Sequence, residues 1–211
     1  MSAVSLGSEG TPLVVESWRG LPLVSIFVAF RTGSFFDPVG KEGLARITGR
    51  MLRRGTTARS AAALAMAIDR LGAEVTVETS ASTVAVFAQV VRRNVWPLVT
   101  LLAELLGAPA MEGAELEALR RISIAELASA ADDDATLGYR AFRRAMFGGH
   151  PFGRPTRGRT ATLPSITRDD VVGYYRGHLT RENVVFGFAG DISRDEAARA
   201  AEELLAGLPS A

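Results

Sequence analysis

The chain has 211 residues, of which 47% are hydrophobic, with a formal net charge of +1 at pH 7 and no cysteine. A charge this close to zero gives no general attraction to nucleic acid, and the lack of cysteine excludes disulfides, thiolate nucleophiles and cysteine-bound metal. Two histidines, His150 and His178, are too few for a multi-histidine metal site. No apolar run approaches the ~20 residues that span a bilayer, and the N-terminus lacks the features of a signal peptide. We expect one domain over residues 1–211, with no membrane span, in the cytoplasm or periplasm of a bacterium.

Two strands and a helix are predicted at the start of the chain. Residues 11–18 and 23–31 are rich in β-branched and aromatic side chains and flank the turn sequence Arg-Gly-Leu-Pro, so we expect a hairpin. A loop with proline and glycine separates them from a helix over residues 42–53. Gly55 occupies the position at which a left-handed residue ends a helix.

Helices dominate the rest of the chain. Ser60 is expected to cap a helix that ends at Leu71, and residues 73–91 alternate as two strands. Further helices are predicted over residues 94–106, 113–131 and 134–147, with a strand at 182–191. Thr167 and Ser193 are expected to cap helices that end at His178 and Ala206. Locally paired strands and blocks of helices indicate an α+β fold with a mostly antiparallel sheet covered by helices.

The helix over residues 42–53 carries a row of cations. Arg46, Arg50 and Arg53 are spaced 4 and 3 residues apart, so they share one helical face, and Gly49 interrupts the helix beside them. Lys41 is the only lysine of the chain, a bias toward arginine that is typical of a GC-rich genome. Arginine enrichment alone therefore indicates no function.

Four segments together resemble the insulinase/pitrilysin-type zinc peptidases, which include the mitochondrial processing peptidase. They read FRTGSFFDPVGKEGLARITGRMLRRGT, DRLGAEVTVETSASTVAVFAQV, HPFGRPTRG and ITRDDVVGYYRGHLTRENVVFGFAGD, in the order and spacing of that family. The resemblance covers nearly the whole chain and implies the α+β fold of the family, whose members consist of paired halves of about 200 residues. This chain is similar to one N-terminal half, so its own C-terminal half is an expected partner if the sequence is truncated.

The resemblance also implies that a zinc centre has been lost. In active members the first helix carries H-x-x-E-H, in which two histidines bind zinc and the glutamate activates water. Arg46, Gly49 and Arg50 stand at those three positions, and neither a guanidinium nor glycine can do this chemistry. The third ligand of the family, a glutamate, corresponds to Glu126, 126 − 50 = 76 residues after Arg50. We therefore expect no metal, no cofactor and no catalysis.

Glu126 has two possible surroundings. It pairs with Arg46 or Arg50 and links two helices, or all three side chains face water. A buried carboxylate without a partner is costly, which favours the pair.

The function implied by the resemblance is that of a non-catalytic subunit. It would form a heterodimer with a zinc-bearing H-x-x-E-H peptidase subunit, contribute part of the chamber wall and bind a shared peptide substrate as an added strand. The strand at residues 82–90 is similar to the chamber-side strands of the family, and Arg53 is a candidate lining residue. The alternative is a structural assembly subunit, like the core proteins of the respiratory cytochrome bc complex.

Other polar residues are interpreted as structural. His150 belongs to a shaped loop, and His178 is suited to the C-terminal end of a helix. The run from Asp132 to Asp134 lacks the spacing of a calcium loop and predicts a helix break with Asp133 or Asp134 as N-cap. A carboxylate pair for catalysis or a phosphate patch of arginines has no supporting context, so we expect no nucleic-acid partner.

Overall fold

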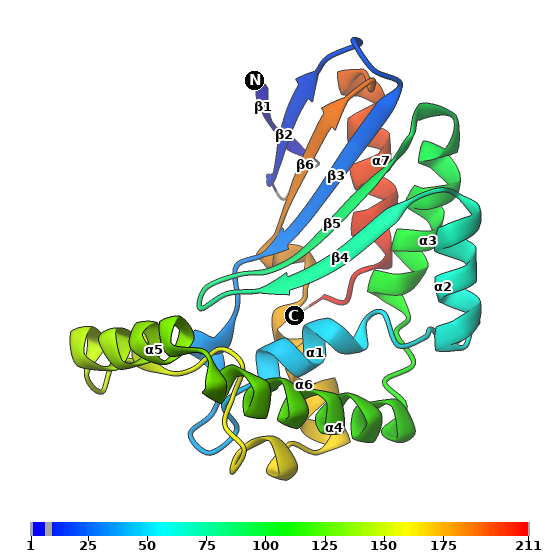
Figure 1. Cartoon of the computed structure of the whole chain (residues 1–211). Helices are drawn as coiled ribbons and strands as arrows, with labels where there is room; N and C mark the ends of the chain where they lie inside the picture. The colour runs from blue at the N-terminus through cyan, green and yellow to red at the C-terminus, as the bar shows by residue number, and fades with distance from the viewer. Residues whose placement is uncertain (1, 7–9, 211) are drawn as a thin grey trace.

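The computed structural model describes residues 2–6 and 10–210 and contains a six-stranded mixed sheet (Figure 1). Its strands lie in the order β1-β2-β6-β3-β5-β4. All neighbouring pairs are antiparallel except β2 and β6, which are parallel. The strands are β1 (Ser2–Leu6), β2 (Thr11–Ser17), β3 (Leu23–Phe30), β4 (Glu74–Thr79), β5 (Val84–Val91) and β6 (Val184–Gly190).

The predicted hairpin between residues 11–18 and 23–31 is wrong. Both strands form, but β6 lies between them and pairs with each. Phe186 of β6 stands opposite Leu13 on one side and Val28 on the other, so three apolar side chains meet in the core. The turn sequence is a local signal, whereas a strand from the end of the chain decides the pairing. Strand β1 was not predicted.

Seven helices accompany the sheet in the described part of the chain. They are α1 (Leu44–Met51), α2 (Ala61–Arg70), α3 (Val95–Gly107), α4 (Gly113–Ser129), α5 (Asp134–Phe147), α6 (Arg168–His178) and α7 (Arg194–Gly207). Helices α3 and α7 pack side by side along the sheet, whereas α1, α4 and α6 gather below it and α5 projects to one side (Figure 1). None of the described helices is long and apolar enough to cross a membrane.

Helix boundaries differ from the prediction mainly at α1. The helix spans Leu44–Met51 rather than residues 42–53, and Gly55 lies four residues beyond its end. Gly55 does adopt a left-handed φ of 103°, but it lies in a turn that leads to the bridge between Thr56 and Pro109. Its role is to shape that turn, not to cap the helix. The predicted caps Ser60, Thr167 and Ser193 are confirmed, and of the two candidates Asp133 and Asp134 it is Asp133 that caps α5.

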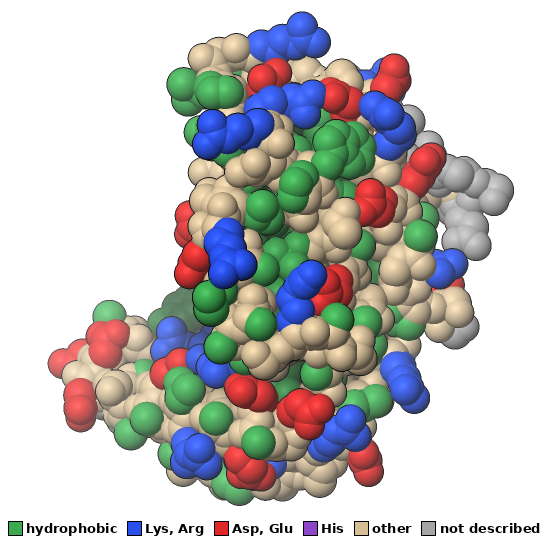
Figure 2. All heavy atoms as spheres, turned by 90° about the vertical axis from the view of Figure 1, so that its right-hand side faces the viewer, with side chains coloured by type: hydrophobic (Ala, Val, Ile, Leu, Met, Phe, Trp, Pro, Cys, Tyr) green, Lys and Arg blue, Asp and Glu red, His purple; other side chains and the backbone are tan. Residues whose placement is uncertain are grey.

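The two faces of the sheet differ in burial. Val24, Ile26 and Val28 alternate along β3 and belong to the core on the helix-covered face. On the opposite face the rings of Phe27 and Phe87 lie 4.8 Å apart, and 42% of Phe87 is exposed. On the side seen in Figure 2, charged side chains of both signs are scattered among hydrophobic ones, and the outline is hollowed where the lower part projects beneath the sheet.

The strand that resembles the chamber-side strands of the family has no free edge. Strand β5, which contains most of residues 82–90, is paired with β3 on one side and β4 on the other. The edge strand on this side of the described sheet is β4. A sheet edge for a peptide therefore lies on β4, one strand further out than β5.

Candidate functional site

The N-terminus of α1 is held by a buried carboxylate. Asp37 accepts hydrogen bonds from the backbone N–H groups of Gly43 and Ala45, each at 2.8 Å, and only 2% of the residue is exposed. Gly43 has a φ of 102°, which favours glycine and lets the chain turn into the helix. Burial raises the pKa of Asp37 to about 6, although its two backbone hydrogen bonds act in the opposite direction. These contacts fix where α1 begins.

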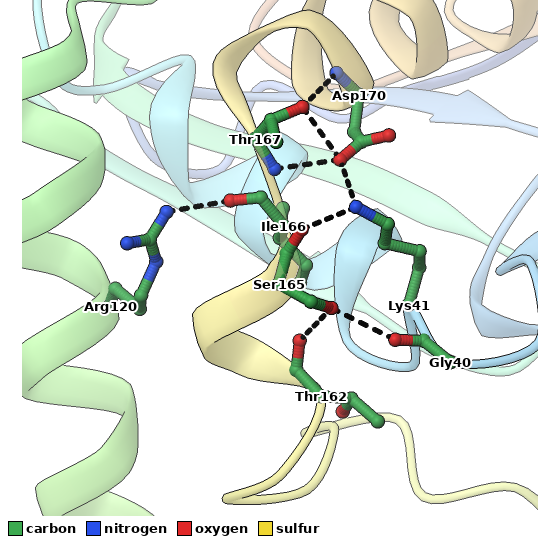
Figure 3. Close-up of polar contacts among 8 residues, drawn as sticks. All are labelled: Gly40, Lys41, Arg120, Thr162, Ser165, Ile166, Thr167 and Asp170. Carbon is green, nitrogen blue, oxygen red and sulfur yellow. Dashed lines mark hydrogen bonds and ion pairs between the residues drawn. The ribbon is translucent and has the colours of Figure 1, made fainter.

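A second polar cluster ties α1 to its neighbours (Figure 3). Lys41, just before α1, donates to Asp170 Oδ2 at 2.6 Å and to the carbonyl of Ser165. Asp170 belongs to the capping box of α6. From the opposite side, Arg120 of α4 donates to the carbonyl of Ile166 at 2.6 Å. The segment before α6 therefore joins α1, α4 and α6, which fixes the faces that α1 and α4 present to each other.

Gly49 lets α1 lie close to the sheet. A Cβ atom at this position would stand 3.1 Å from Thr79 Oγ1 and 3.3 Å from methyl groups of Val77 and Val84. A larger side chain would require the helix or strands β4 and β5 to move. Packing thus explains why a glycine stands at position 49, beside the arginine row.

Two arginines of α1 bind the same glutamate of α4. Arg50 donates to both carboxylate oxygens of Glu126, at 3.0 and 2.9 Å, and Arg46 donates to Oε2 at 2.9 Å. Arg50 also donates to the buried Ser123 Oγ at 3.1 Å. The exposed fractions are 27% for the Arg46 side chain, 22% for Arg50 and 36% for Glu126, so the cluster is partly shielded from water. The predicted pairing is confirmed, with both arginines taking part.

The pKa values follow from this arrangement. Burial raises the pKa of Glu126, but hydrogen bonds and charges from Arg50 and Arg46 outweigh it, so the pKa lies below its usual 4.5. Burial lowers the pKa of Arg46, and so do the charges of Arg50 and Arg157. The hydrogen bond to Glu126 raises it. A guanidinium keeps its proton at any physiological pH. The cluster at neutral pH therefore consists of two cations and one carboxylate.

The row of contacts continues through Arg54 rather than Arg53. Arg54 NH1 lies 3.5 Å from Glu115 Oε2 on α4. Since α1 ends at Met51, the helical spacing that placed Arg53 beside Arg50 no longer applies. Arg53 is exposed and has no side-chain partner among residues 2–6 and 10–210. Arg54 also lies beyond the end of α1, so helical spacing gave no signal for its contact with Glu115.

The two histidines occupy structural positions. Nδ1 of His150 accepts a hydrogen bond from the backbone N–H of Phe152 at 3.2 Å, and its ring lies 5.9 Å from that of Phe35. The ring of His178 lies 4.5 Å from that of Tyr174, and burial lowers its pKa. Neither belongs to a group of three metal-ligating side chains, and no such group occurs in the described residues.

Comparison with known sequences gives the family. The family model described as "Insulinase (Peptidase family M16)" matches residues 14–160, and a second, "Peptidase M16 inactive domain", matches residues 165–211. The chain belongs to the insulinase family. An "uncharacterized zinc protease" of Rickettsia bellii is 25% identical over 205 residues, which cover 97% of this chain and 50% of that protein. A "probable mitochondrial-processing peptidase subunit beta" of Schizosaccharomyces pombe is 24% identical over 204 residues, 96% of this chain and 45% of that protein.

Solved structures of the insulinase family have the same fold. The peptidase M16 inactive domain from Pseudomonas fluorescens superimposes with a TM-score of 0.92 at 23% identity, over 100% of this chain and 51% of that one. The α+β architecture predicted from sequence is thus confirmed. The chain spans about half the length of the curated relatives and of this structure.

The name of the Rickettsia relative implies zinc, but the cluster on α1 and α4 does not match a zinc site. Zinc in proteins takes neutral imidazole, thiolate or carboxylate ligands. Of the three side chains that converge here, only Glu126 is of that kind, and its two oxygens already accept three hydrogen bonds from Arg46 and Arg50. The residues present do not fit a zinc ion.

Proposed function

We propose that this chain is a non-catalytic insulinase-family domain that forms a heterodimer with a zinc-bearing peptidase subunit of the same family. It contributes part of the chamber wall and binds the peptide substrate jointly with that subunit. The observation that carries the proposal is the ion-pair cluster of Arg46, Arg50 and Glu126, which we interpret as standing in the place of a metal centre.

The argument depends on where the cluster lies. By resemblance, Arg46 and Arg50 occupy the two histidine positions of H-x-x-E-H, Glu126 occupies the third ligand position, and Gly49 replaces the general base. The contact of all three side chains across α1 and α4 supports this correspondence, because metal ligands must converge in the same way. Arg46 and Arg50 neutralise the retained glutamate, and Gly49 itself supplies no general base. Catalysis therefore belongs to the partner.

Residues 1–211 correspond, in this proposal, to one N-terminal half. The solved relative is about twice as long, which supports a second half or an equivalent partner. Peptide binding is assigned to β4, whose outer edge is free of other described strands. Backbone N–H and C=O groups of such an edge can pair with an extended peptide. Since Thr79 of β4 lies against Gly49, a peptide there would pass beside α1.

The test is a reconstitution. The tagged chain is purified from its host, and co-purifying proteins are searched for an H-x-x-E-H sequence. Cleavage of a quenched fluorescent peptide is then measured for that protein alone and with this chain added. We expect the chain to raise turnover by about tenfold or more, since the chamber wall is completed. Unchanged turnover, or co-purification with unrelated subunits only, would favour the assembly-subunit alternative.

Metal content gives an independent check. The purified chain is dialysed against micromolar zinc and its metal content is measured by elemental analysis. We expect far less than one zinc per chain, because the guanidinium groups of Arg46 and Arg50 bind Glu126, the one carboxylate of the cluster. One tightly bound zinc per chain would overturn the proposal that this domain is non-catalytic.

A further inference from the structure

A large arginine-lined pocket lies between α5 and the loop of residues 153–159, with a volume of about 1020 Å³. Its lining includes six arginines and no aspartate or glutamate. The arginines are Arg140, Arg143, Arg144, Arg154, Arg157 and Arg159. In a chain whose net charge is only +1, this is a strong local excess of positive charge.

Two of these arginines make contacts that stabilise the walls of the pocket. Arg143 donates to the carbonyl of Phe152 and lies 5.9 Å from the centre of the Tyr139 ring. Arg154 donates to the carbonyl of Asp37 at 2.8 Å, which ties the loop to the cap of α1. These contacts hold α5 and the loop in place on either side of the pocket.

The other four have no structural role of this kind. Arg140 and Arg144 are exposed on α5, one helical turn apart, and Arg157 and Arg159 are exposed on the loop. Their guanidinium groups have no hydrogen-bond or ion-pair partner within the described residues. Unpaired like charges that line one pocket repel one another, and an anionic ligand would remove that cost.

The pocket also has apolar surface. Leu127, Leu137, Tyr139 and Pro155 also line the pocket, and 62% of Tyr139 is exposed. The volume is at the upper limit of small-molecule sites, roughly 300–1,000 Å³. A ligand that matches both features carries several carboxylates and apolar side chains, as an acidic peptide does. The pocket adjoins the cluster on α1 and α4, since the charge of Arg157 in its lining acts on Arg46.

We infer that this pocket binds an acidic peptide segment. Its carboxylates pair with Arg140 and Arg144 on one wall and with Arg157 and Arg159 on the other, while its apolar side chains contact Leu137 and Tyr139. The inference deepens the proposed function by naming the class of peptide. It concerns binding to this chain alone, so it can fail while the role as a non-catalytic partner stands.

The experiment measures fluorescence anisotropy of labelled octapeptides with the purified chain at physiological ionic strength. One peptide alternates glutamate and leucine, and its matched control alternates lysine and leucine. We expect the acidic peptide to bind at least about tenfold more tightly, with affinity falling as salt is raised. Equal binding of both peptides, or none by the acidic one, would overturn the inference.

Charge-reversal variants locate the site. R140E/R144E on α5 and R157E/R159E on the loop should each weaken binding by about tenfold or more. R19E/R93E makes the same change in net charge at two exposed arginines that do not line the pocket, and should change affinity less than about twofold. Circular dichroism checks that each variant is folded. Equal weakening by R19E/R93E, or displacement of the peptide by a short single-stranded DNA at similar concentration, would show a general polyanion effect and overturn the inference.

Discussion

Glu126 accepts hydrogen bonds from Arg46 and Arg50, and the three side chains are about a quarter to a third exposed. At the scale of single residues, this cluster is a bridge between α1 and α4. Its charges are partly screened by solvent, so its contribution lies between that of a surface pair and that of a buried one. Removal of the carboxylate leaves two guanidinium groups without an anionic partner.

Glu126→Gln should therefore lower the free energy of unfolding by roughly 1–2 kcal/mol at pH 7. The folded-state pKa of Glu126 is below its unfolded value of about 4.5, so the contribution is complete above that pH and is lost as pH falls through the folded-state pKa. Urea unfolding at pH 7 and in steps below pH 4.5 measures both effects. Glu117→Gln on the same helix is the control, because its pair with Arg120 leaves 55% of the Glu117 side chain exposed. Equal losses in the two variants would contradict the bridge.

Arg46→His combined with Arg50→His should restore a zinc site. The two imidazoles would stand one turn apart and face Glu126, which supplies a third ligand. We expect about one zinc per chain by elemental analysis, and weaker binding by about tenfold or more when Glu126→Gln is added. Peptide hydrolysis is not expected, because Gly49 supplies no general base. Failure of the double variant to bind zinc would contradict the correspondence of these positions to metal ligands.

At the scale of elements, the position of α1 is set at two points. Asp37 binds the N–H groups at its start, and Gly49 allows its middle to approach β4 and β5. The helix is only eight residues long, which is short for independent stability. Tertiary contacts rather than intrinsic propensity therefore maintain it.

Gly49→Leu should destabilise the protein by roughly 1–3 kcal/mol, because the added side chain meets Thr79, Val77 and Val84 within a few ångströms of its Cβ. The matched control is Gly173→Leu in α6, where an added Cβ would have no neighbouring atom within 4 Å and the residue is exposed. That change should be neutral or stabilising by up to about 1 kcal/mol, since leucine has the higher helix propensity. Thermal unfolding followed by circular dichroism compares the two. Similar losses in both variants would show that the close approach of α1 is not the cause.

The cap of α1 predicts a pH dependence of the opposite sign to that of Glu126. The pKa of Asp37 rises from 3.8 in the unfolded chain to about 6 in the fold. A raised pKa stabilises the fold below the unfolded value, and this stabilisation is lost as pH rises through about 6. The free energy of unfolding of the wild type relative to Asp37→Asn should therefore decrease between pH 4 and pH 7. A difference that stays constant or increases over this range would contradict the burial of a titrating carboxylate.

At the scale of the whole molecule, one continuous core joins the sheet to both groups of helices. Val28 of β3, Leu119 of α4 and Leu204 of α7 belong to the same buried cluster. By contrast, α5 contributes no buried side chain and leaves Tyr139, Phe142 and Met146 exposed. The body below the sheet is therefore part of the same unit, and α5 is attached through its contacts with the loop that follows it.

Residues 1–211 should unfold as one cooperative unit, as a single domain does. Far-ultraviolet circular dichroism reports all the helices, and fluorescence of Trp18 and Trp96 reports the sheet and α3. We expect the two urea-unfolding curves to coincide. Separate transitions would indicate that α1, α4 and α6 form an independent domain, contrary to the proposed single unit.

Much of the fold and part of the site could be predicted from local sequence patterns. Composition identified β2 and β3, and alternation identified β4 and β5. Ser60, Thr167 and Ser193 fixed helix starts because capping depends on residues only two or three positions apart. The spacing of Arg46 and Arg50 predicted a shared helical face, and burial cost favoured their pairing with Glu126. Helix α1 was predicted two residues too long at each end, because the intrinsic pattern continues beyond the tertiary contacts that hold it.

The sequence by itself determined the seven helices and all the strands except β1, the class of fold, and that the side chains at 46, 49 and 50 include no metal ligand or general base. Only the tertiary structure decided that β6 separates β2 from β3, that β4 rather than β5 forms the sheet edge, and that both arginines bind one carboxylate. It also brought the arginines of α5 and of residues 153–159 to one pocket. The physical reason is range: periodicity and capping act within a few residues, whereas strand order and charge clusters depend on burial shared by segments far apart in the chain.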